Sequence, residues 1–82
     1  MKSYNQTLNK ALLIGAHSYF NGGSQWIGAH DYLDAVSFIY EVDRADWMND
    51  YDRRWDQLMS MGMTSDGIIA FLKSRIQSDT WG

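Results

Sequence analysis

The sequence predicts an all-α domain, a compact bundle of about four short helices. The chain has 82 residues, of which 45% are hydrophobic, and this is enough for one small core. Apolar side chains recur at helical spacing in four segments. Proline is absent, and glycines stand between the segments as the breaks. We therefore expect residues 1–82 to form a single small helical domain.

The first two expected helices are rich in apolar residues. The first runs from about Tyr4 to Phe20 and is apolar on most sides. The second begins between Ser24 and Gly28 and ends near Val42. Its apolar set covers more than half of the helix circumference, so we expect this helix to be central and to contact several neighbours. That set is Ala29, Tyr32, Leu33, Ala35, Val36, Phe38, Ile39, Tyr40 and Val42.

The third expected helix is clearly amphipathic. Either Asp43 or Asp46 suits its N-cap, and Gly62 lies just past its end. Asp46 and Asp50 fall on the polar side at about 100° per residue, so we expect them to face solvent. The apolar side consists of Trp47, Met48, Tyr51, Trp55, Leu58 and Met59.

The last expected helix begins at Thr64 or Ser65, both of which are good N-caps, with Asp66 in the first turn. Its inner face consists of Ile68, Ile69, Leu72 and Ile76.

One alternative fold is an α+β domain with a hairpin near residues 17–28. Asn21 and Gly22 would form its turn, because Asn-Gly favours the two-residue turns of hairpins. Tyr19, Phe20 and Trp26 would supply the flanking aromatics that strands prefer.

Charge is concentrated in the middle of the chain. The formal net charge is −3. Residues 31–56 hold eight acids against Arg44, Arg53 and Arg54, which leaves −5 in this part. This argues against direct nucleic-acid binding, which requires clustered Lys and Arg, and it favours a basic protein partner.

Several other classes are disfavoured by composition and motif. There is no cysteine, which excludes disulfides, thiolate metal sites and a Cys nucleophile. No apolar run is long enough for a membrane span, and no signal peptide is evident, so we expect a cytoplasmic protein. Phosphate-binding, zinc-protease and serine-hydrolase motifs are missing, and the acidic stretch lacks the glycine and glutamate of an EF-hand. We therefore expect no enzyme, no catalytic residue, no cofactor and no metal.

These observations favour a non-enzymatic interaction protein that inhibits or regulates a nucleic-acid-handling protein. Its carboxylates would take the place of phosphates on a basic surface of that partner. Small, cysteine-free, acidic proteins of phages and plasmids that disarm restriction or CRISPR systems are similar in general character. Homodimerisation would be another way to bury surplus apolar surface. The expected partner-binding residues are Trp26, Asp34, Glu41, Asp43, Asp46, Asp50, Asp52 and Asp56.

Two other functions stay open from the sequence. The third and fourth helices would form a helix-turn-helix transcriptional regulator, with Lys73 and Arg75 as its DNA contacts. A near-repeat of residues 14–20 at 27–33 places His17 and His30 at equivalent positions, which suggests a small enzyme or ligand binder built around the two histidines.

Overall fold

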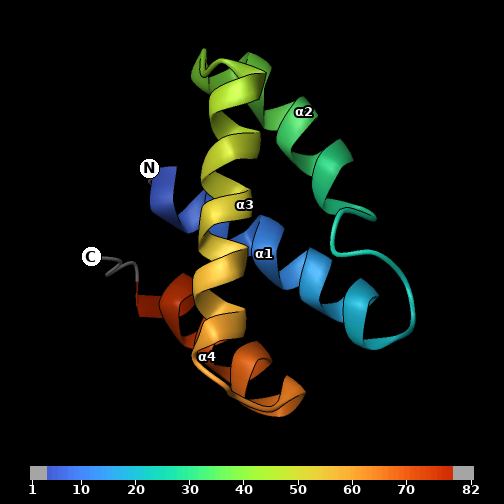
Figure 1. Cartoon of the computed structure of the whole chain (residues 1–82). Helices are drawn as coiled ribbons and strands as arrows, with labels where there is room; N and C mark the ends of the chain where they lie inside the picture. The colour runs from blue at the N-terminus through green and yellow to red at the C-terminus, as the bar shows by residue number, and fades with distance from the viewer. Residues whose placement is uncertain (1–3, 79–82) are drawn as a thin grey trace.

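The computed structural model describes residues 4–78, which form four α-helices and no strand (Figure 1). The all-α prediction is confirmed, and the hairpin alternative is wrong over the described residues. The helices are α1 (Tyr4–Phe20), α2 (Ala29–Tyr40), α3 (Arg44–Ser60) and α4 (Ser65–Ser78).

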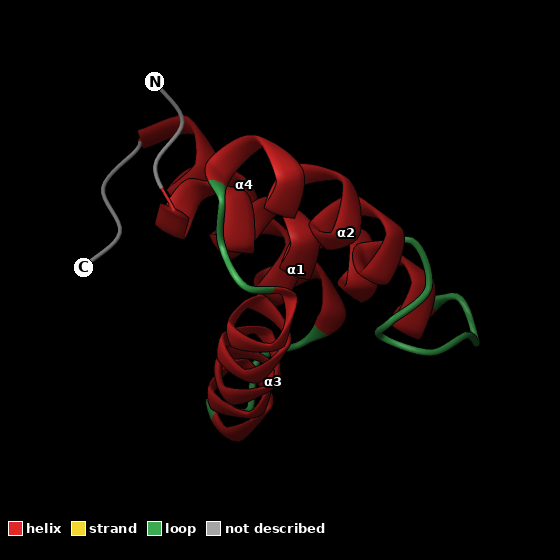
Figure 2. Ribbon diagram, turned by 90° about the horizontal axis from the view of Figure 1, so that it is seen from above, coloured by secondary structure: helices red, strands yellow, loops and turns green. Residues whose placement is uncertain are grey.

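Helix α1 is the centre of the fold. It packs against the three other helices, most extensively against α4. Figure 2 looks nearly along α3 and shows α1, α2 and α4 gathered on one side of it. The buried apolar core joins all four helices: Leu8, Ala11, Leu12, Ala16, Ala29, Leu33, Trp47, Tyr51, Trp55, Leu58, Ile68 and Leu72.

The prediction that α2 is central is wrong. Its wholly buried positions are Ala29 and Leu33, while Phe38 and Ile39 are 87% and 74% exposed. The reason is that α2 packs on α1 and α3 along one side only, and over residues 4–78 no helix covers the opposite side. An apolar circumference alone did not reveal how many neighbours the helix would have.

The end of α1 explains why the hairpin does not form. Gly22 adopts φ +93°, and its N–H donates to the Tyr19 carbonyl at 3.1 Å. The Gly23 N–H donates to the Ser18 carbonyl at 2.9 Å. These two bonds form a Schellman motif, which satisfies the last carbonyls of the helix. Tyr19 and Phe20 therefore stay helical rather than pairing with the segment that follows.

The start of α3 is fixed by Asp43 rather than Asp46. The Asp43 carboxylate accepts a hydrogen bond from the Ala45 N–H at 2.8 Å, which makes it the N-cap. Gly62 follows the helix with φ +70°. At α4, the Thr64 hydroxyl accepts from the Gly67 N–H at 3.2 Å and caps that helix in the same way.

Helices α1 and α3 cross very closely at Gly15. The Tyr51 hydroxyl of α3 donates a hydrogen bond to the Gln25 carbonyl directly over Gly15. A Cβ atom at residue 15 would lie 2.0 Å from that hydroxyl, so only glycine fits. This contact ties α1, α3 and the segment before α2 together at one point.

Candidate protein-binding surface

The predicted inward side of α3 is confirmed. Trp47, Tyr51 and Trp55 are buried. Trp55 meets Tyr19 of α1 edge to face, with ring centroids 5.4 Å apart. The acids of this helix are consequently left on its outer surface.

Those acids form two separate rows rather than one face. At 100° per residue, Asp46 and Asp50 share one flank of α3, while Asp52 and Asp56 share the other. Arg53 lies between the two rows and interrupts them with a positive charge. A partner that contacts one row therefore has no continuous acidic path to the other.

The first row is partly occupied by contacts within the protein. The Tyr4 hydroxyl donates a hydrogen bond to the Asp50 carboxylate, and Arg53 lies 3.9 Å from the same carboxylate. The Tyr4 ring stacks on Trp47 with centroids 4.5 Å apart. Burial, and then the hydrogen bond and charge of Asp50, raise the pKa of Tyr4 to about 12. Asp50 thus helps to hold α1 to α3, and Asp46 is the exposed member of this row.

The second row is open to solvent. Asp52 and Asp56 are exposed and lie one helical turn apart. Partial burial raises the pKa of the Asp52 carboxyl, and the neighbouring negative charge of Asp56 raises it further. Two like charges at this spacing repel each other, so a cationic group placed between them would be favoured.

Helices α2 and α3 are linked by Arg44. Its guanidinium donates one hydrogen bond to the Asp34 carboxylate and another to Nε2 of His30. Because arginine has no acceptor atom, Nε2 of His30 is the acceptor in this contact. Asp34 therefore joins the two helices at this corner, while 37% of its side chain stays exposed.

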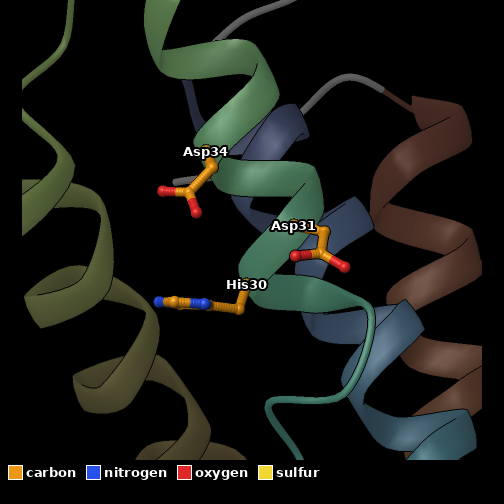
Figure 3. A group of neighbouring side chains, drawn as sticks. All are labelled: His30, Asp31 and Asp34. Atoms are coloured by element: carbon orange, nitrogen blue, oxygen red, sulfur yellow. The ribbon is translucent and has the colours of Figure 1, made fainter.

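The same histidine belongs to a group with metal-ligand atoms. One ligand atom from each of His30, Asp31 and Asp34 lies within 4.8 Å of the others. In Figure 3, His30 and Asp34 extend toward α3, whereas Asp31 extends to another side of α2. Arg44 already supplies positive charge between His30 and Asp34, so a metal ion would have to displace it. Among the described residues, His17 is not a member of this group.

The chain leaves α2 and enters α3 through an exposed corner. Glu41 stands at the end of α2 in the left-handed conformation, with φ 54°, and is exposed. The large apolar side chains of Phe38 and Ile39 are exposed immediately before it. We call this set the corner surface: Phe38, Ile39, Glu41, Asp43 and Asp46.

The apolar half of the corner surface was not predicted, because Phe38 and Ile39 were placed in the apolar set of a helix expected to be central. A signal was present in the spacing. Ala29, Leu33 and Val36 define one stripe at helical period, and Phe38 falls almost opposite this stripe.

Trp26, which the sequence also predicted as a partner-binding residue, packs against other aromatic side chains. It is half-buried in the segment before α2, where its ring packs on Tyr51 with centroids 4.3 Å apart. It also meets His30 edge to face at 6.1 Å. Trp26 is therefore separate from the corner surface and lies at the other end of α2.

The basic residues are dispersed. Arg44 is bound to α2, and the half-buried Arg54 donates to the Asn5 side chain. On α4, Arg75 lies over the Phe71 ring at 5.0 Å and Lys73 is exposed. The helix-turn-helix alternative thus gains no support from a basic cluster in residues 4–78.

No protein-family model, curated protein or solved structure matches this chain. Within residues 4–78, none of the helices has the length and apolarity required to cross a membrane. Helical bundles serve many unrelated functions, so the functional inference depends on surface chemistry rather than on the fold.

Proposed function

We propose that this chain is a non-enzymatic interaction protein that binds a basic surface of another protein through the corner surface. The observation that carries the proposal is the exposure of Phe38 and Ile39 a few residues before the exposed acids Glu41, Asp43 and Asp46 in the chain. Neighbouring apolar side chains with this much exposure favour a contact site. The three acids add the charge that selects the partner.

The acids indicate the chemistry of that partner. A second copy of this chain would bring like charges together at the corner surface, which is unfavourable. A partner with Lys and Arg around an apolar depression would complement both halves of the surface. Proteins that handle nucleic acid carry such basic surfaces, because they contact phosphates. An inhibitor or regulator of a nucleic-acid-handling protein, such as an anti-restriction or anti-CRISPR protein of a phage or plasmid, is the most concrete form of the proposal.

Two variants with matched effects on the fold test the role of charge. Asp46→Lys changes the first turn of α3, and Asp66→Lys changes the first turn of α4. Both sites are exposed, both changes add two positive charges, and both oppose the helix dipole by about 0.3–1 kcal/mol. We expect Asp46→Lys to weaken binding to the partner at least about 10-fold and Asp66→Lys to leave it nearly unchanged.

The experiment identifies the partner first. Proteins retained from a host lysate by the wild-type chain and by Asp66→Lys, but not by Asp46→Lys or by the double variant Phe38→Ser with Ile39→Ser, are identified by mass spectrometry. The purified candidate is then titrated calorimetrically at low and high salt, and with nucleic acid as a competitor. Loss of binding in both lysine variants alike, or affinity that is independent of salt, would refute the proposal.

A further inference from the structure

A second surface feature lies at the opposite end of α2. A pocket of about 490 Å³ is lined by Trp26, Ile27, His30 and Met48. Three of these side chains are apolar, and Ile27 is 58% exposed. A volume and lining of this kind are typical of sites that bury an apolar group.

The walls of this pocket are held in place by the protein itself. Tyr51 supports the Trp26 ring from within the core, and the Trp26 N–H donates to the Ser24 hydroxyl at 3.1 Å. The backbone N–H of His30 donates to the Trp26 carbonyl at 3.1 Å, and Arg44 contacts Nε2 of the histidine ring. A preformed site loses little conformational freedom when a ligand enters, and this favours binding.

The surroundings of the pocket are negatively charged. The carboxylates of Asp31 and Asp34 lie within 4.8 Å of a ring nitrogen of His30, and Arg44 balances only Asp34. On α3, Asp52 follows Met48 by one turn and lies on the same side of that helix. Both Asp31 and Asp52 are exposed. Each of these two carboxylates therefore lies near a residue that lines the pocket, Asp31 beside His30 and Asp52 one turn after Met48.

We propose that the pocket binds one large apolar side chain of a partner protein, presented by a linear segment in which Lys or Arg flanks that side chain. The apolar walls would take the side chain, and Asp31 and Asp52 would pair with the flanking cations. An acidic segment would be repelled by the same two carboxylates. This proposal rests on the proposed function, because it supplies a second contact for a basic protein partner.

The test uses synthetic peptides and the full chain labelled at methyl groups. The probe is the capped pentapeptide Gly-Lys-Phe-Arg-Gly. One matched peptide has Ala for the Phe, and another has Glu for both the Lys and the Arg. We expect the probe to shift the methyl resonances of Ile27 and Met48 with a millimolar dissociation constant, which is typical of a ligand this small. The Glu peptide should bind at least about 5-fold more weakly, and the Ala peptide should cause no comparable shift.

Variants locate the binding. Ile27→Ser removes the most exposed wall and should abolish the shift at Met48. The double variant Asp31→Asn with Asp52→Asn should weaken the probe at least about 5-fold, while Glu41→Gln with Asp46→Asn at the corner surface should leave its affinity unchanged. Circular dichroism confirms that each variant keeps its helix content.

The outcomes separate the two proposals. If the Ala or Glu peptide shifts Ile27 and Met48 as strongly as the probe does, the pocket proposal is overturned. The same holds if the probe causes no shift, even where the corner variants abolish partner binding and support the proposed function. If the probe behaves as expected but the corner variants bind the partner normally, the pocket proposal is supported and the role of the corner surface is refuted.

Discussion

Replacing Gly15 with alanine is the sharpest test of the helix crossing at the centre of this fold. A Cβ atom there would lie 2.0 Å from the Tyr51 hydroxyl and 2.2 Å from the Gln25 carbonyl oxygen. The hydroxyl belongs to a buried ring and the carbonyl to the backbone, so neither can move aside cheaply. Helices α1 and α3 must separate, or the segment before α2 must shift.

The expected cost follows from three contributions. Overpacking a well-filled interior costs about 1–3 kcal/mol. Loss of the Tyr51–Gln25 hydrogen bond costs about 1 kcal/mol or more, because its partners are at least partly buried. Alanine returns about 1 kcal/mol through its better helix propensity. We therefore expect Gly15→Ala to lower the free energy of unfolding by about 1–3 kcal/mol, which corresponds to roughly 4–24 °C in melting temperature for a domain of this size.

Gly67 in α4 provides the matched control. A Cβ atom there would meet Thr64 and Met63 at 3.4 Å and beyond, which is ordinary contact. Gly67→Ala should therefore stabilise the protein by about 0.5–1 kcal/mol. Urea unfolding followed by circular dichroism measures both variants. If Gly15→Ala is as stable as Gly67→Ala, the close crossing is refuted. Combining Gly15→Ala with Tyr51→Phe removes one of the two clashes, so the effects of the pair should not add.

Three further measurements test the core, the aromatic contacts and the exposed side of α2. Asn9 is buried, and neither polar atom of its side chain has a hydrogen-bond partner among the described residues. Asn9→Leu should therefore raise the free energy of unfolding, measured by urea titration, by about 1–2 kcal/mol. A loss of stability would contradict this expectation. Leu33→Ala should cost about 2–5 kcal/mol, whereas Ile39→Ala should change stability by less than about 0.5 kcal/mol, and equal costs would mean that Ile39 belongs to the core. The pKa of Tyr4, raised to about 12 from an ordinary value near 10, means that the folded state holds this proton more tightly than the unfolded state. Its stabilising contribution is thus complete below pH 10 and is lost as pH rises from 10 toward 12, and in ultraviolet absorbance titrations Asp50→Asn should move the Tyr4 transition to lower pH.

The sequence was informative where one helix decides its own structure. The N-cap of α3, its buried tryptophans and the glycine after its end all follow from local preferences and the period of the helix. The same holds for α1 and α4, whose starts and lengths match their apolar patterns.

What could not be predicted depends on contacts between distant residues. Exposure of Phe38 and Ile39 is decided by which helices cover α2, and this depends on the placement of α1 at the centre. The pairing of Arg44 with Asp34 and His30 joins two helices whose relative position is not encoded in either one. Helix geometry alone predicts that the acids of α3 fall into two rows. The hydrogen bond from Tyr4 to Asp50 could not be predicted in this way, because it depends on how α1 packs against α3.

The exposed strip of α2 also limits the shape of whatever covers it. Phe38 and Ile39 are consecutive, so their side chains leave the helix about 100° apart, and the small side chain of Ala35 emerges between them. A flat partner surface could contact one of these two side chains but would leave the other exposed to solvent. A partner with a ridge that contacts Ala35, or with a cleft that surrounds this side of the helix, would bury both side chains.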